Sequence, residues 1–392
     1  MFLVCVGLFS AGVLWGTALP ETVTLKNEVT LALMMNGQAV GSMQVRPGKE
    51  VKLIRQVEGH LEISVGAAWG TVAVADTDFE SKLAELRARE NQPAAVPSAP
   101  DEKSVAKINP EPQAEPAAEA QSMELDVVAE PRPGSYDVAE FRLWHPDIRQ
   151  EPRAVLVLVP GFNGDGRRMA RDQAWQAIAR EFNWLIIACR FKEGNYQNPE
   201  AGSGAALFDA IESMGKEVKQ RGLEDLPLVM WGISAGGQFN YNFAQWKPEQ
   251  VLTFVVNKGA YYTAHRNKKA QEVPALFFIG MKDKEIRIKN INGIFLEGRE
   301  KNAPWALIRE PNQGHGAGAS KEFSRAYFRT IFPMRLPDGQ DKLQEVKLDQ
   351  GYLGHLKTYQ IVEAGSEDWD TEDSTWLPTQ ELVHQWCQIV NP

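Results

Sequence analysis

The chain has 392 residues, of which 43% are hydrophobic and 24% charged, and its formal net charge is −9. These proportions are typical of globular proteins, and the length suits two domains joined by a connecting segment. The negative balance, with no lysine-rich run, excludes a surface built to follow nucleic-acid phosphates, so we expect no nucleic-acid partner.

The first residues form an apolar leader. Residues 1–19 carry no charged side chain, and Gly16 and Ala18 occupy the −3 and −1 positions of a signal-peptidase site. We therefore expect residues 1–18 to be a signal peptide and the mature protein to be secreted or periplasmic. An uncleaved membrane anchor is the alternative, because the stretch approaches spanning length and lacks basic residues before it.

Cleavage would remove Cys5 and leave Cys189 and Cys387 in the mature chain. These two could form one disulfide in an exported protein. A free core thiol is the alternative for Cys189, since it ends the buried-strand pattern WLIIAC, and nothing in the spacing suggests a metal site.

Residues 21–78 alternate short β-like runs with turn signals such as Asn36-Gly37 and Pro47-Gly48. This spacing predicts a small all-β, barrel-like domain. The stretch RPGKEVKLIRQVEGHLEISVGAAWGTVAVADTDF resembles bacterial SH3-like domains. The resemblance implies attachment to a peptide or cell-envelope partner, and a small folded appendage is the alternative.

A helix and a linker follow. Residues 79–91 have alternating charges and predict a short solvated helix. Residues 92–133 are dominated by Pro, Ala and Glu, which predicts a disordered linker because such a segment buries too little apolar area to offset its ordering entropy. The residues that carry chemistry should then lie within 134–392.

The region 134–392 alternates β and α signals. Its apolar runs predict strands at 135–144, 154–160, 184–189, 227–232, 251–257, 275–280 and 305–310. Most are continuous apolar runs, as expected for parallel strands covered on both faces. The pattern predicts a doubly wound, mostly parallel sheet, with ligands at the carboxyl ends of its strands.

A serine follows one of these strands. Residues 232–236 read Gly-Ile-Ser-Ala-Gly, a G-x-S-x-G between the strand at 227–232 and a helical pattern. In that context the motif predicts a sharp turn that presents the hydroxyl of Ser234 above the sheet edge as a nucleophile. A glycine-rich joint without chemistry is the alternative.

A nucleophilic serine needs a base and an acid. His315 lies between two glycines on the loop after the last strand, a place with little packing reason for a histidine. Asp283 lies three residues after the strand at 275–280 and would fix the tautomer of that histidine. Glu285 is the alternative acid. The other histidines lie elsewhere, and of these His265, His355 and His384 compete with His315.

The fourth requirement is a place for the developing oxyanion. The turn PGFNGDG follows the strand at 154–160, so the backbone N–H of Phe162, or alternatively that of Asn163, could pair with the N–H of Ala235. We expect Asn163, Tyr196 and Tyr261 to contact the substrate. Tyr262 could join them, whereas Trp231 and Trp305 suit core packing better.

With these four loops in chain order, residues 135 to about 335 resemble an α/β-hydrolase. The resemblance implies acyl transfer through an acyl-enzyme, with Ser234, Asp283 and His315 as the triad and with no metal or organic cofactor. The loops PGFNGDG and GISAGG are most similar to secreted esterases of the polyhydroxybutyrate-depolymerase and feruloyl-esterase type. Those enzymes often have His-Gly where this chain has Pro160-Gly161.

We therefore predict an exported serine esterase acting on small or glycan-linked esters. A prolyl-oligopeptidase-like peptidase is one alternative, although 392 residues leave no room for its usual propeller domain. The other alternative is a non-catalytic protein that binds the cell envelope through its N-terminal domain. The tail after residue 337 should pack against the flank of the sheet.

Overall fold

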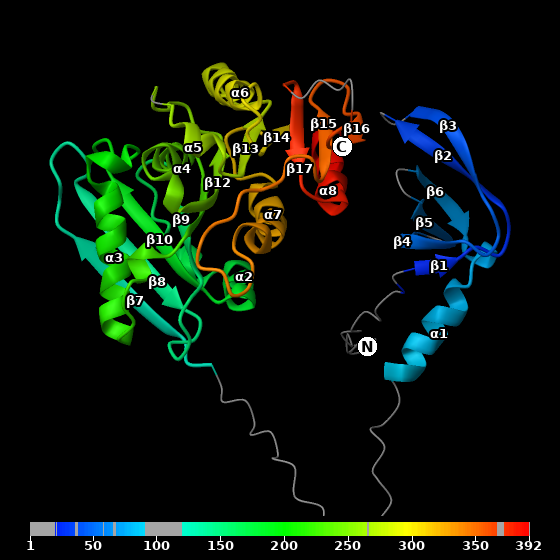
Figure 1. Ribbon diagram of the computed structural model, residues 1–392, viewed down its shortest axis with the longest axis horizontal. Coiled ribbons are helices and arrows are strands. Elements are labelled where there is room, and N and C mark those ends of the chain that lie inside the picture. Colours follow the sequence, from blue (N-terminus) through cyan, green and yellow to red (C-terminus); the bar gives the residue numbers. More distant parts are fainter. Residues whose placement is uncertain are drawn as a thin grey trace, which may run out of the picture. The chain divides into compact units, whose positions relative to one another are not determined.

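The computed structural model describes residues 20, 22–35, 38–57, 59–65, 68–90, 120–264, 266–366 and 372–391. The expected signal peptide lies outside the described residues, as does most of the expected linker. The chain divides into two compact units, one within residues 1–113 and one within residues 114–392 (Figure 1). Across the described ranges, no helix combines the length and apolarity needed to cross a bilayer.

The N-terminal unit is built from antiparallel strands. Four of them form a sheet in the order β1-β4-β5-β6, and β2 pairs with β3. The strands are β1 (Thr22–Thr24), β2 (Val29–Met35), β3 (Gln38–Val45), β4 (Glu50–Val57), β5 (His60–Val65) and β6 (Ala68–Ala73). The small all-β domain expected from the turn spacing is therefore present, while its SH3-like identity stays a prediction.

The helix α1 (Phe79–Glu90) lies where a short helix was expected at 79–91, but one of its faces is buried and not solvated. Phe79 is fully buried and Leu83 nearly so, and both belong to the core of the N-terminal unit with Leu61 and Ile63. Phe79 and Leu83 are four residues apart and share one helix face, so the first turns of α1 pack on the sheet. The alternating charges of this segment predict solvent exposure, and among the side chains of α1 that the structure describes only two apolar ones belong to this core.

The second unit is built on an eight-stranded sheet in the order β14-β13-β12-β11-β9-β10-β8-β7. The six strands from β14 to β10 in that order are parallel, and β8 and β7 are antiparallel to their neighbours. The strands are β7 (Met123–Ala129), β8 (Val138–His145), β9 (Ala154–Val159), β10 (Trp184–Lys192), β11 (Leu228–Gly232), β12 (Val251–Asn257), β13 (Ala275–Gly280) and β14 (Trp305–Glu310). The doubly wound, mostly parallel sheet is thus observed.

The expectation of a disordered linker over 92–133 was wrong for its last part, because β7 lies there and pairs with β8 along its whole length. Its side chains alternate between half-buried and exposed. Asp126 and Glu124 both form ion pairs with Arg142 of β8. The surrounding Pro- and Glu-rich composition hid this short alternating run, which is a weak signal beside the apolar runs of the inner strands.

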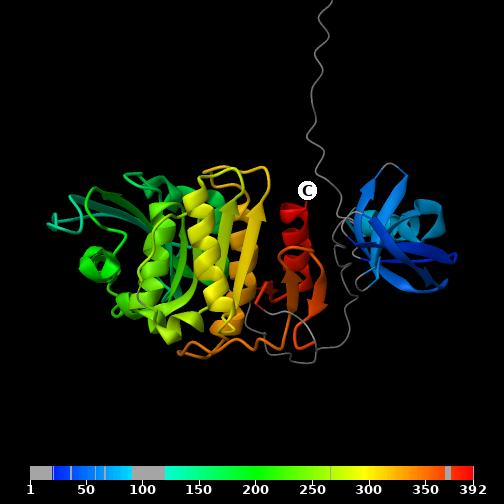
Figure 2. The same cartoon turned by 90° about the horizontal axis from the view of Figure 1, so that it is seen from above.

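Helices cover both faces of the sheet (Figure 2). The helices α2 and α7 contact each other on one face, and α3, α4 and α6 lie against the other. The helices are α2 (Gln173–Phe182), α3 (Ser203–Val218), α4 (Ala235–Trp246), α5 (Lys268–Gln271), α6 (Glu285–Arg299), α7 (Ser320–Arg335) and α8 (Gln380–Val390). Short 3₁₀ turns span Val74–Asp76, Arg167–Arg171, Pro199–Ala201, Leu223–Asp225 and Pro248–Gln250.

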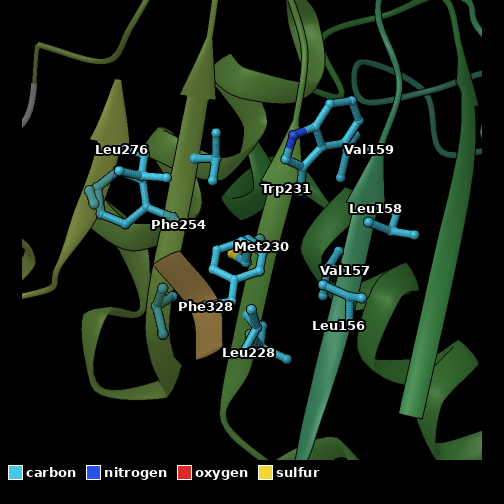
Figure 3. Packing of buried hydrophobic residues seen from close by; sticks show 14 of the residues in the cluster. Leu156, Val157, Leu158, Val159, Leu228, Met230, Trp231, Phe254, Leu276 and Phe328 are labelled. Carbon is cyan, nitrogen blue, oxygen red and sulfur yellow. The ribbon is translucent and has the colours of Figure 1, made fainter. Parts of the chain in front are cut away.

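The core lies between the sheet and these helices. Every residue of β9 is fully buried, as the continuous apolar run predicts for a strand covered on both faces. Figure 3 shows Phe328 of α7 beside Met230 and Leu228 of β11, next to the β9 side chains. Trp231 and Trp305 are core residues, each 1% exposed.

The tail after residue 337 forms its own small sheet beside β14. Strands β15 (Tyr352–His355), β16 (Ile361–Glu363) and β17 (Ser374–Leu377) pair in the order β16-β15-β17. Both β17 and α8 contact β14. The buried Trp386 of α8 donates a hydrogen bond from its indole N–H to the carbonyl of Leu307. The tail thus covers the flank of the large sheet, as expected.

Cys189 and Cys387 are both free thiols. Cys189 is completely buried in β10, and this burial raises the pKa of its thiol far above the usual range. The sequence left open a disulfide between these two cysteines or a free core thiol at Cys189, and the structure has the free thiol.

Candidate active site

The site begins at Ser234, which stands between β11 and α4. Its backbone has φ 55° and ψ −119°, a conformation that non-glycine residues rarely adopt. Two backbone hydrogen bonds, one to each neighbouring strand, hold this conformation. The N–H of Ser234 donates to the carbonyl of Asn257 at 2.7 Å, and the N–H of Ile233 donates to the carbonyl of Val159 at 3.3 Å. A strained serine over-determined by its neighbours is a feature of functional sites.

Two glycines make this turn possible. A Cβ on Gly232 would lie 2.4 Å from the carbonyl oxygen of Gly236, and a Cβ on Gly236 would lie 2.2 Å from that of Val159. The helix α4 therefore starts in direct contact with the end of β9. Both glycines of the G-x-S-x-G motif are required by backbone contacts.

Ser234, His315 and Asp283 come together as the sequence predicts. The Oγ of Ser234 lies 3.0 Å from Nε2 of His315, and Nδ1 of His315 lies 2.7 Å from Oδ2 of Asp283. The consistent proton assignment has Nδ1–H donating to Asp283, which leaves Nε2 as acceptor of the serine hydroxyl proton. These three side chains come from loops after β11, β13 and β14.

Asp283 is held as a carboxylate. Its side chain is only 3% exposed, and its Oδ1 accepts hydrogen bonds from Nη1 of Arg287 at 2.8 Å and from the N–H of Lys284 at 2.7 Å. Burial acts to raise the pKa of Asp283, but the hydrogen bonds from His315, Lys284 and Arg287 outweigh it, so the pKa lies below its usual value.

The alternative residues lie away from this arrangement. Glu285, the alternative acid, is exposed at the first turn of α6. His355 uses Nδ1 to accept the backbone N–H groups of Lys357 and Thr358 in a turn of the C-terminal sheet. His384 is on α8 with Gln388 as its partner. His265 lies outside the described residues.

The PGFNGDG turn lies beside Ser234, since a Cβ on Gly161 would be 3.5 Å from the Cβ of the serine. The N–H of Ala235 is at the first position of α4, where an N–H has no acceptor within its own helix. Phe162 lines the same cleft with a 53% exposed side chain. The side chain of Asn163 instead pairs with Glu193. The N–H groups of Phe162 and Ala235 stay the predicted donors to an oxyanion.

Ser234 opens into a cleft of about 600 Å³. Amide side chains and aromatic rings share its walls; the lining residues are Phe162, Asn195, Gln197, Asn198, Glu200, Ser234, Ala235, Gln238, Asn242, Ala260, Tyr261, Tyr262, Thr263 and Arg287. Gln238 and Asn242 of α4 accept the N–H groups of Ala260 and Thr263. The helix that follows the serine therefore also holds the segment 260–263 of the cleft wall.

Of the three residues expected to contact substrate, only Tyr261 lines the cleft, with 66% of its side chain exposed. Tyr196 is 1% exposed and stacks beneath Phe162, with ring centroids 6.0 Å apart, because Phe162 takes the exposed position above it. Asn163 turns away and exchanges two hydrogen bonds with Glu193. The expectation was wrong for Tyr196, which is buried beneath Phe162, and Asn163 is not among the residues that line the cleft.

Three charged residues escaped the sequence reasoning. Arg287 follows Asp283 by four residues, a spacing that suggests an ion pair at a helix start. Lys258 directly follows β12 and pairs with Glu310, the last residue of β14. The position of a lysine directly after an apolar strand could have indicated this buried pair.

No family model and no curated protein matches this chain. Solved structures do match part of it. One is poly(aspartic acid) hydrolase-1 from Sphingomonas sp. KT-1, which is 17% identical over 52% of this chain and 97% of that one, with a TM-score of 0.40. A poly(3-hydroxybutyrate) depolymerase from Bordetella parapertussis is 17% identical over 56% and 92%, with a TM-score of 0.41.

A ferulic acid esterase is similar in the same way, with 11% identity over 54% of this chain and 97% of that one and a TM-score of 0.40. These matches are distant.

Proposed function

We propose that this chain is a serine hydrolase that cleaves carboxylic esters through an acyl-enzyme. The observation that carries the proposal is the continuous chain of contacts from Ser234 Oγ to His315 at 3.0 Å and from His315 to Asp283 at 2.7 Å. The loop order along the chain, serine, acid and then histidine, supports membership of the α/β-hydrolase superfamily.

In this proposal His315 Nε2 takes the proton of Ser234 as Oγ attacks the ester carbonyl. The oxygen that becomes negative is stabilised by the N–H groups of Phe162 and Ala235. His315 returns the proton to the departing alcohol as the C–O bond breaks, which leaves an acyl group on Ser234. Water then repeats the sequence and releases the acid. Asp283 stays ionised throughout and stabilises the imidazolium.

The lining of the cleft favours a polar, sugar-like alcohol group. Amides such as Asn195 and Asn198 offer donors and acceptors to hydroxyl groups, and the exposed rings of Phe162 and Tyr261 offer apolar faces to a sugar or aryl ring. We therefore include acyl groups on glycans among the substrates of the proposed esterase.

The test is reaction with a fluorophosphonate probe and with p-nitrophenyl acetate, each measured on the wild type and on Ser234→Ala. We expect labelling of Ser234 and hydrolysis in the wild type and neither in the variant. A folded wild type that reacts with neither probe would contradict the proposal and favour a non-catalytic protein. Cleavage of peptide anilides without preference for esters would favour a peptidase.

Export belongs to the proposal and stands on the sequence of residues 1–18 alone. The N-terminal unit is proposed to bind a cell-envelope partner, on the strength of its SH3-like sequence pattern. A mass of the mature protein that lacks residues 1–18 would support export. Sedimentation of residues 20–90 with purified cell walls, compared with residues 120–392, would test the second point.

A further inference from the structure

Beneath the proposed active site lies a buried ion pair. The side chain of Lys258 is 0% exposed and that of Glu310 is 7% exposed, and Lys258 Nζ bonds directly to Glu310 Oε2. Lys258 follows β12 and Glu310 ends β14, while β13 lies between those strands. The lysine side chain must therefore cross the end of β13, the strand that leads to Asp283.

The backbone is shaped for this crossing. Lys258 has φ 55°, an unusual conformation for a residue with a long side chain. A Cβ on Gly280, the last residue of β13, would lie 2.3 Å from the carbonyl oxygen of Gly314 in the histidine loop and 2.9 Å from Cε of Lys258. Glycine at this position therefore leaves room for both the histidine loop and the lysine stem.

The pair is tied to all three loops of the site. Glu310 Oε1 accepts the N–H of Ala319 at 2.8 Å, and its carbonyl accepts the N–H of Met281 at 3.0 Å. Lys258 Nζ also donates to Oδ1 of Asn257 at 3.1 Å, and the carbonyl of Asn257 holds the N–H of Ser234. One buried network thus joins the serine turn, the aspartate loop and both ends of the histidine loop.

A buried ion pair is a weak source of stability, because apolar residues of similar volume often do as well. We propose that Lys258 and Glu310 are positioning residues, which hold the loops of Ser234, Asp283 and His315 at their reacting distances. This inference rests on the proposed function. It predicts that the pair acts on turnover, because small displacements between a nucleophile and its base are costly.

The test uses Lys258→Met, Glu310→Gln and the variant that combines these two changes. Arg335→Met is the control variant. Arg335 is a buried cation that bonds to Leu252 at the opposite end of β12, so it serves as the matched control. Each single variant leaves one buried charge unpaired and should lower the unfolding temperature. The double variant removes both charges and should regain most of that loss.

For the double variant we expect kcat to fall at least about tenfold with KM within about twofold, because no bond then crosses β13. The far-downfield proton resonance of His315 Nδ1–H should shift or broaden. In Arg335→Met, kcat and the resonance should stay as in the wild type. A double variant with wild-type kcat and resonance would overturn the inference. An inactive wild type that nevertheless shows the resonance would count against the proposed function alone.

Discussion

Replacing Gly236 by alanine should test whether the close contact between α4 and β9 is what presents Ser234 for reaction. The added Cβ would lie 2.2 Å from the carbonyl oxygen of Val159 and 2.7 Å from that of Pro160, whereas an ordinary contact is 3.4–4 Å. Because both neighbours are backbone atoms, the start of α4 must move away from β9 by roughly 1 Å, and a displacement of that size can cost on the order of 10²-fold in rate. The overlap should also cost about 1–3 kcal/mol of stability.

Gly293 provides the control. It lies on the exposed face of α6, and a Cβ there would have nothing within 4 Å. Gly293→Ala should therefore raise the unfolding free energy by about 0.5–1 kcal/mol and leave catalysis unchanged. The assays are kcat/KM for p-nitrophenyl acetate, the rate of fluorophosphonate labelling and urea unfolding. A Gly236→Ala protein that folds and keeps wild-type kcat/KM would refute the argument that this contact presents Ser234.

Further predictions concern the base, the cleft wall and the tail. Asp283→Asn should lower kcat by about 10³–10⁴-fold, since His315 loses the acceptor that fixes its tautomer; steady-state kinetics decide this. Folding lowers the pKa of Asp283, so the ionised carboxylate stabilises the folded state at pH values above its unfolded pKa of about 3.9. This stabilisation should be lost as the pH falls through the folded pKa. The urea midpoint measured from pH 6 down to pH 2 should therefore decrease less in Asp283→Asn than in the wild type. Phe162→Ala should raise KM for aryl esters about 2- to 10-fold while kcat holds, since the backbone N–H remains; an unchanged KM would remove Phe162 from the binding wall. Trp386→Ala should cost about 3–5 kcal/mol in urea unfolding, and a loss below 1 kcal/mol would show that α8 is dispensable to β14.

The parallel strands and the three proposed catalytic side chains could be placed from the sequence for a single physical reason. Strands buried on both faces must be continuous apolar runs, and the carboxyl ends of parallel strands meet at one edge. Ser234, Asp283 and His315 each follow such a run, so their meeting follows from topology. The structure adds the distances and the hydrogen bonds to Asp283.

Other features depended on partners that a pattern does not reveal. Tyr196 is buried because Phe162 stacks over it, and the two are far apart in the sequence. Lys258 tolerates burial because Glu310 lies opposite it, two strands away. In both cases a tertiary contact decides the exposure of a side chain, and local propensity carries no record of that contact.

Strand β7 also sets where the second unit can be separated from the rest of the chain. The pairing from Met123 opposite His145 to Ala129 opposite Ala139 occupies one whole side of β8. A fragment starting at residue 134 would bare that side of β8, whose Phe141 and Leu143 belong to the core, and would offer a template for edge-to-edge aggregation. A fragment starting at residue 120 keeps the strand and should remain monodisperse.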